Sequence, residues 1–130
     1  MTRTGKCLCG AVTFTAEPFG TSQACHCDMC RTWGGGPYMA VPCETASFEG
    51  PVQRYRSSDF AERGFCGTCG THLFFHMLGG ERHGIPIGIF DDQSDLPFKG
   101  EIYIDEKPDF YAFEGERKCL TGAEFEARFR

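Results

Sequence analysis

The chain has 130 residues and carries 13 lysines and arginines against 18 aspartates and glutamates, which gives a formal net charge of −5. This acidic balance argues against nucleic acid as a partner, because phosphate binding needs clustered basic side chains. No apolar run approaches the roughly 18 residues of a membrane span, and the N-terminal residues lack the apolar stretch of a signal peptide. We therefore expect a cytoplasmic protein that binds neither nucleic acid nor a membrane.

The expected strands are short and frequent. In chain order they cover residues 11–15, 38–41, 52–56, 73–75, 85–90 and 101–105, each with alternating or continuous apolar side chains. Pro86 should push its strand toward an edge or a bulge. Glycine, proline and Asx residues at 34–37, 49–51, 79–80 and 91–95 indicate turns. With 41% hydrophobic residues and no repeat or linker, the chain is expected to form one mainly β domain over residues 1–130.

Two segments have helical character. A short turn is expected around Asp28 to Thr32, and a short helix is expected over residues 121–129 near the C-terminus. Thr121 and Glu124 have the spacing of a capping box, in which each side chain bonds the other residue's backbone amide. Phe125 and Phe129 form an apolar pair four residues apart that could dock on a sheet.

Seven of the nine cysteines fall into three groups with chelating spacing. The groups are Cys7-Leu8-Cys9, Cys25-His26-Cys27-Asp28-Met29-Cys30 and Cys66-Gly67-Thr68-Cys69. In a reducing compartment such cysteines are more often metal ligands than disulfide partners, and zinc commonly takes four thiolates in a tetrahedron. Gly67 lies between two of these cysteines, and Gly10 and Gly70 each follow one, where a metal-binding turn needs positive φ or close approach of backbone amides.

The number of ligands suggests two different sites. The two pairs, Cys7 with Cys9 and Cys66 with Cys69, supply four ligands and predict a closed, structural zinc site. Cys25, Cys27 and Cys30 supply three ligands and predict a second zinc with one open position. An open position is typical of a zinc that performs chemistry.

Other roles for these residues remain open at this stage. The cysteines could instead form disulfides or pack as small apolar side chains, and Cys66 with Cys69 could be a redox pair. A fourth protein ligand would close the three-cysteine site and make its ion structural. The candidate donors are Cys43, Cys119, His26, His72, His76 and Asp28. Cys43 and Cys119 stand alone and receive no role, whereas His72 and His76 lack the glutamate of a zinc-protease helix and favour a strand.

Three sequence blocks, residues 5–12, 25–31 and 65–71, resemble those of the glutathione-dependent formaldehyde-activating enzyme family, also called the centromere protein V domain family. The resemblance implies an Mss4-like fold of mostly antiparallel strands, a zinc held by four cysteines and a looser zinc on Cys25, Cys27 and Cys30. It also implies a carbon–sulfur lyase whose reverse reaction joins glutathione to formaldehyde as S-(hydroxymethyl)glutathione.

An open zinc position suits this chemistry, because a thiol that enters it loses its proton near neutral pH. Arg31 and Trp33 are candidates to contact a carboxylate or the body of a small thiol, although Trp33 could equally anchor the core. His26 and Asp28 are candidates to move the proton. Glutathione or a similar thiol and a small aldehyde are therefore the expected partners.

The chain departs from the family pattern toward its C-terminus. Glu101 stands where the family often has a histidine, Phe110 or Tyr111 where it often has a tryptophan, and Gln93 where proline is frequent. These changes lie outside the ligand blocks and concern the substrate more than the metal. The rival interpretation is a non-catalytic zinc-stabilised module that binds a protein, and a DNA-binding zinc finger is disfavoured by the acidic balance.

Overall fold

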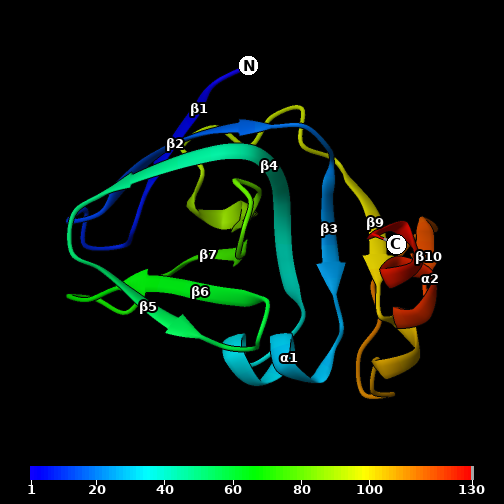
Figure 1. Ribbon diagram of the computed structural model, residues 1–130. Helices are drawn as coiled ribbons and strands as arrows, with labels where there is room; N and C mark the ends of the chain where they lie inside the picture. Colours follow the sequence, from blue (N-terminus) through cyan, green and yellow to red (C-terminus); the bar gives the residue numbers. More distant parts are fainter. Residues whose placement is uncertain (130) are drawn as a thin grey trace.

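The long strand β4 (Tyr38–Glu49) is the centre of a sheet of ten strands in this computed structural model, which describes residues 1–129 (Figure 1). The other strands are β1 (Arg3–Lys6), β2 (Thr13–Pro18), β3 (Ser22–Cys25), β5 (Val52–Arg56), β6 (Ala61–Cys66), β7 (His72–Met77), β8 (His83–Pro86), β9 (Phe98–Ile102) and β10 (Lys118–Leu120). The helices are α1 (Asp28–Gly34) and α2 (Gly122–Glu126), with 3-10 turns η1 (Ile87–Ile89), η2 (Ile104–Glu106) and η3 (Ala127–Phe129).

Strand β4 pairs with different neighbours along its length. Its first residues pair antiparallel with β3 on one side and with β8 on the other, and its second half pairs with β2. The strands β8, β7, β6 and β5 then follow as an antiparallel meander. As a result β1, β2 and the end of β4 lie above β5 to β7 in Figure 1.

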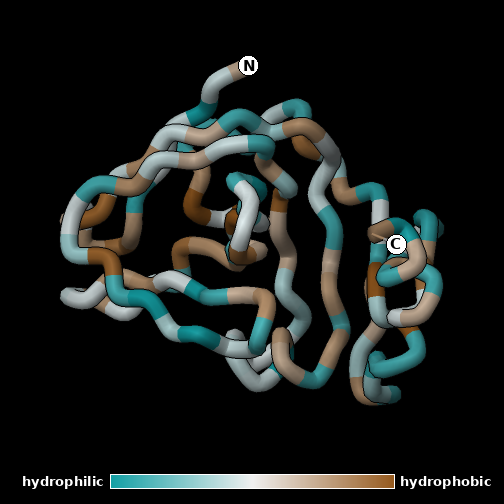
Figure 2. Tube along the Cα trace, in the orientation of Figure 1, coloured by the Kyte–Doolittle hydropathy of each residue, from teal (hydrophilic) through white to brown (hydrophobic). Residues whose placement is uncertain are grey.

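The main core fills the space between these two layers. Phe14 of β2 and Phe48 of β4 have ring centroids 5.2 Å apart, and Phe48 lies 4.8 Å from Phe74 of β7. Leu73 and Val41 are completely buried beside them. Each such side chain contributes about 1.5–3 kcal/mol on burial. By contrast β5 is exposed along most of its length, and its hydrophilic residues are teal in Figure 2.

A second, smaller apolar cluster lies where β3, β9, β10 and α2 meet. Strand β9 pairs parallel with both β3 and β10, and this brings Ile102 beside Cys25. Cys25, Cys30 and Ile102 are buried there, and Tyr103 and Phe125 pack against them. The mainly β fold with a short C-terminal helix is thus confirmed, while these two strand pairs are parallel in an otherwise antiparallel sheet.

Some predicted elements differ from the structure. The strand expected over 101–105 ends at Ile102, because Tyr103 adopts a left-handed conformation with φ of 55° and the chain enters η2. The strand expected over 85–90 ends at Pro86 and continues as η1. The strands β1, β3, β6 and β10 were not expected, because their polar and small residues form no apolar pattern and neighbouring strands supply their pairing.

The predicted capping box of α2 is confirmed. The Thr121 hydroxyl accepts from the Glu124 amide at 3.1 Å, and the Glu124 carboxylate accepts from the Thr121 amide at 2.8 Å. Phe125 packs on Tyr103, with ring centroids 5.9 Å apart, whereas Phe129 is 59% exposed. Only the first member of the expected aromatic pair therefore docks on the sheet. None of the helices among residues 1–129 has the length and apolarity needed to cross a membrane.

Thr121→Ala should lower the free energy of unfolding by about 1 kcal/mol, because it removes the hydroxyl that accepts from the Glu124 amide in the first turn of α2. Urea unfolding followed by circular dichroism measures this change. Thr121→Ser keeps the hydroxyl and is the matched control, which should remain close to the parent protein. Equal losses in the two variants would contradict a role for the cap.

Candidate metal centres

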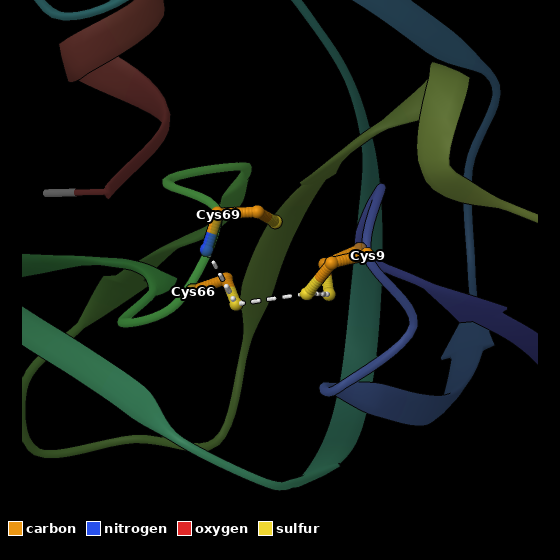
Figure 3. Close-up of side chains that lie close together, drawn as sticks. Cys9, Cys66 and Cys69 are labelled. Carbon is orange, nitrogen blue, oxygen red and sulfur yellow. Dashed lines mark hydrogen bonds between the residues drawn. The ribbon is translucent and has the colours of Figure 1, made fainter.

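Four cysteine sulfurs converge where the loop after β1 meets the loop between β6 and β7. The Sγ atoms of Cys7, Cys9, Cys66 and Cys69 all lie within 4.8 Å of one another. Figure 3 shows Cys9 directed toward Cys66 and Cys69 from the opposite loop. The Sγ atoms of Cys7 and Cys9 are 3.6 Å apart, and those of Cys9 and Cys66 are 3.9 Å apart. Four thiolates around one zinc ion stand about 3.8 Å apart when each bond is about 2.3 Å.

Both loops form the same kind of turn. The Gly10 amide donates to the Cys7 carbonyl at 3.1 Å, and the Gly70 amide donates to the Cys66 carbonyl at 2.9 Å. Gly10 and Gly70 have φ values of +81° and +80°, as expected from their positions after a cysteine. A side chain at either position would strain this left-handed backbone.

Backbone and side-chain donors surround the sulfur atoms of this cluster. The amides of Thr68 and Cys69 donate to the Cys66 Sγ at 3.3 and 3.4 Å. Hydrogen bonding to Thr71 lowers the pKa of Cys69 to about 5. The Thr71 hydroxyl also accepts from the Leu8 amide at 3.1 Å, which joins the two loops directly. Cys69 therefore favours its thiolate form, and the four cysteines together can hold a metal ion with four protein ligands.

Cys25, Cys27 and Cys30 form a second sulfur cluster at the junction of β3 and α1. Their Sγ atoms also lie within 4.8 Å of one another. Cys25 ends β3, Cys27 caps α1 and accepts from the Cys30 amide at 3.3 Å, and Cys30 lies within the helix. Hydrogen bonds from the Cys25 and Cys30 thiols lower the pKa of Cys27 to about 2. The group therefore favours a negative charge on Cys27, the least buried of the three.

Within residues 1–129, no fourth histidine, cysteine or carboxylate places its ligand atom in the three-cysteine group. Cys43 is fully buried on β4 and lies 3.5 Å from the Val41 carbonyl. Cys119 is exposed on β10, and the Asp28 carboxylate is 80% exposed. Neither lone cysteine joins a sulfur cluster, and all nine cysteines, which lie within the described part of the chain, are free thiols.

The histidines proposed as donors have other contacts. His72 stacks on Trp33 with ring centroids 4.5 Å apart, and its pKa is lowered by burial and by the nearby Arg63. His76 pairs with Glu62 at 2.8 Å. Both lie on strand β7, as predicted. Neither histidine therefore supplies a fourth ligand atom to the three-cysteine group.

His26 lies between two of the clustered cysteines but faces away from them. Its ring is fully buried, with Nδ1 2.7 Å from the Tyr111 hydroxyl and Nε2 2.7 Å from the Glu101 carboxylate. Arg117 donates to the other Glu101 oxygen at 2.7 Å. Burial alone would raise the pKa of Glu101, but the hydrogen bonds from Arg117 and His26 hold it below its usual value.

This arrangement does not support His26 as the group that moves a proton, because both ring nitrogens are already hydrogen-bonded. It instead fixes the backbone between Cys25 and Cys27. Glu101, and either Phe110 or Tyr111, are the positions where the sequence is expected to depart from the family pattern, and Glu101 and Tyr111 are direct partners of His26. The sequence had not linked them, because 75 and 85 residues separate them from His26.

The two predicted substrate contacts lie on α1. The Arg31 Nε donates to the His26 carbonyl at 2.9 Å, and its side chain remains 27% exposed. Trp33 is half-buried and packs on His72 and Phe65, which ties α1 to strands β6 and β7. Trp33 thus packs α1 against the sheet, outside the two buried core clusters.

Arg63 is a residue that the sequence did not single out. It lies on β6, is 3% exposed, and places Nη2 3.6 Å from the Cys30 Sγ. Its own strand reads Ala-Glu-Arg-Gly-Phe-Cys, in which nothing distinguishes a buried arginine from an exposed one. Only the folding of β6 against α1 brings it to the sulfur cluster.

The amino-acid sequence was compared with those of known protein families. Residues 2–106 match the family described as glutathione-dependent formaldehyde-activating enzyme. The chain belongs to this family. The resemblance inferred from the three cysteine blocks is therefore confirmed, and the cysteines of both sulfur clusters lie inside the matched region.

One relative and one solved structure extend the comparison. A Schizosaccharomyces pombe protein named as an uncharacterized lyase is 37% identical over 124 residues, which cover 90% of this chain and 89% of that protein. The crystal structure of a Rhodobacter sphaeroides protein aligns with a TM-score of 0.58 at 22% identity and covers 74% of this chain and 99% of the other. The first supports an enzyme of lyase type, and the second concerns the fold alone.

Cys66→Ser should destabilise the protein by several kcal/mol and release metal, because metal bound by four protein ligands contributes directly to folding. Cys27→Ser should lower the metal content by one ion per chain and leave the thermal midpoint nearly unchanged. Metal analysis and thermal melting of protein purified under reducing conditions measure both effects. Cys119→Ser, outside both clusters, is the control. An unchanged midpoint in Cys66→Ser would contradict a structural role for the four-cysteine cluster.

Glu101→Gln should weaken metal binding at the three-cysteine group about tenfold, because it removes the charged partner that orients His26 between two ligands. Competition with a chromophoric chelator measures this affinity separately from the four-cysteine cluster. Glu62→Gln is the matched control, since Glu62 also holds a histidine but lies outside both clusters. Equal affinities in Glu101→Gln and the parent would show that this network does not support the site.

Proposed function

We propose that this protein is a zinc-dependent carbon–sulfur lyase that joins a thiol, glutathione or a similar one, to formaldehyde or a related small aldehyde. The proposal rests on one observation above all: three cysteine sulfurs converge, and the described residues provide no fourth ligand. Membership in the formaldehyde-activating family and the lyase-named relative support it. The nine free thiols suit a reducing cytoplasm, which we propose as its compartment.

The donor sets fit zinc at both clusters. Thiolates are soft ligands that zinc takes in tetrahedral geometry, and the four-sulfur cluster has the spacing for a closed structural site. Cys25, Cys27 and Cys30 would hold a second zinc with one position left for substrate. Bound there, zinc would act as a Lewis acid that lowers the pKa of an entering thiol and polarises a carbonyl.

The proposed reaction conserves atoms and charge. The thiol sulfur attacks the aldehyde carbon, a carbon–sulfur bond forms as the C=O π bond breaks, and the thiol proton passes to the oxygen to give a hydroxymethyl thioether. The lyase direction is the reverse of these steps. No oxidant or reductant is needed.

The surrounding residues of this chain shape the site. Tyr38, Tyr103 and Phe125 pack on the side of Cys25 and Cys30 and keep water from that face. Arg31 remains partly exposed beside the cluster and can pair with a substrate carboxylate, as a bidentate guanidinium does. Trp33 supports this wall of the site through its stacking on His72.

The test measures catalysis against the uncatalysed reaction, because thiols add to formaldehyde without an enzyme. NMR exchange spectroscopy at equilibrium reports the rate at which glutathione and its hydroxymethyl adduct interconvert. The parent protein should accelerate this exchange, Cys27→Ser should lose more than about 90% of the acceleration, and Cys119→Ser should retain it.

The opposite result would favour the rival function. If the zinc-loaded parent accelerates no exchange with glutathione, cysteine or 2-mercaptoethanol, the carbon–sulfur lyase proposal is wrong. A protein-binding module with two structural ions would then be the better interpretation of the same sulfur clusters.

A further inference from the structure

We propose that Arg63 is the group that receives the anionic sulfur of the substrate, and that the site therefore selects thiols that bind as thiolates. This inference rests on the proposed function of the three-cysteine site and deepens it. Neither the family description nor the name of its lyase relative assigns a role to this arginine.

The guanidinium of Arg63 lies in a nearly closed aromatic environment next to the cluster. Its Cζ is 5.1 Å from the ring centroid of Phe75, 5.9 Å from that of Trp33 and 6.0 Å from that of Tyr38. Only 3% of the residue is exposed. Aromatic faces attract a cation, but they do not satisfy its hydrogen-bond donors.

The hydrogen bonding of Arg63 is incomplete. Nη2 donates to the Cys30 Sγ at 3.6 Å, while Nη1 is buried without a hydrogen-bond partner. Among residues 1–129, no carboxylate forms an ion pair with this guanidinium. Burying the Arg63 charge without an anion costs free energy, so we assign the sulfur cluster as its counter-charge. The unpaired Nη1 is then the donor that we assign to a bound anion.

The balance of charge indicates which ligand this is. Three thiolates and a divalent cation leave one negative charge, and the guanidinium cancels it. Without Arg63 the loaded centre would repel an incoming thiolate, whereas with Arg63 a thiolate meets a neutral centre and a free donor. A thiol therefore gains from entering as an anion, which is the form that attacks a carbonyl carbon.

The position of the guanidinium also limits where this anion sits. Because three rings surround the guanidinium and its Nη2 contacts the Cys30 sulfur, we infer that an anion bound by this arginine is small and lies near that sulfur. A sulfur atom at the fourth position satisfies this condition. The carboxylates of a larger thiol are too far from its sulfur to satisfy it, and exposed groups such as Arg31 would bind them instead.

The experiment uses protein loaded with Co²⁺, whose absorption changes when a further sulfur joins the three cysteines. Titration with 2-mercaptoethanol reports the sulfur contact alone, because this probe has no carboxylate, and S-methylglutathione serves as the thiol-free probe. In Arg63→Gln the dissociation constant for 2-mercaptoethanol should rise about ten- to hundredfold, the usual effect of losing a charge-assisted hydrogen bond. The parent should not respond to S-methylglutathione.

Arg54→Gln is the matched control. Arg54 lies on the neighbouring strand β5, is 51% exposed and pairs with Glu62. It should bind 2-mercaptoethanol as the parent does. Cobalt content per chain and thermal midpoint are measured for every variant, so that loss of the ion is separated from loss of the thiol.

Arg63→Lys keeps the test decisive if Arg63→Gln releases the ion or fails to fold. The lysine retains the charge but loses the planar fork, so the loaded variant should bind 2-mercaptoethanol several-fold more weakly than the parent. An unchanged dissociation constant in either loaded variant overturns the inference. These readings are independent of turnover: a parent that binds the thiol through Arg63 but accelerates no adduct exchange would refute the lyase function and leave the thiolate site standing.

Discussion

The contact between two pairs of sulfur atoms is the constraint on which the rest of the structure depends. Cys7 and Cys9 extend from the upper layer of the sheet, Cys66 and Cys69 from the lower one, and their sulfurs lie close enough to share one ion. An ion bound there would link β6 and β7 to the loop after β1 and so brace the two layers that enclose the phenylalanine core. Strand β6, which ends at Cys66, also carries Arg63 to the second cluster, so one strand joins the two groups of cysteines.

The two clusters differ in how they use the same ligand chemistry. In the four-cysteine cluster, backbone amides and Thr71 bond the sulfurs, and the protein supplies every ligand. In the three-cysteine cluster, a buried arginine stands beside Cys30 with one unsatisfied donor. The first arrangement suits a structural ion, and in the function we propose the second leaves a coordination position and a hydrogen-bond donor for a substrate.

The hydrogen bonds around His26 connect distant parts of the chain to the three-cysteine group. His26, Glu101, Arg117 and Tyr111 form one hydrogen-bonded chain, which joins the loop of Cys25 and Cys27 to β9 and the segment after it. The parallel pairing of β9 with β3 makes this possible, because it brings Glu101 alongside Ala24 and Ile102 alongside Cys25. Antiparallel hairpins alone would not join these segments.

The sequence by itself determined the mainly β class, the capping box of α2, the two sulfur clusters and the family. The capping box, each cysteine pair and the three-cysteine group depend on local spacing, because a turn of two or three residues brings neighbouring cysteines together. The sequence joined Cys7 and Cys9 to Cys66 and Cys69 by the number of ligands that one zinc needs, although 57 residues separate Cys9 from Cys66. Only the tertiary structure decided that His26 faces Glu101, that Trp33 packs on β7 and that Arg63 lies against Cys30. Each of these contacts joins residues far apart in the chain, and side chains of such mixed polarity give no periodic pattern from which the pairing could be inferred.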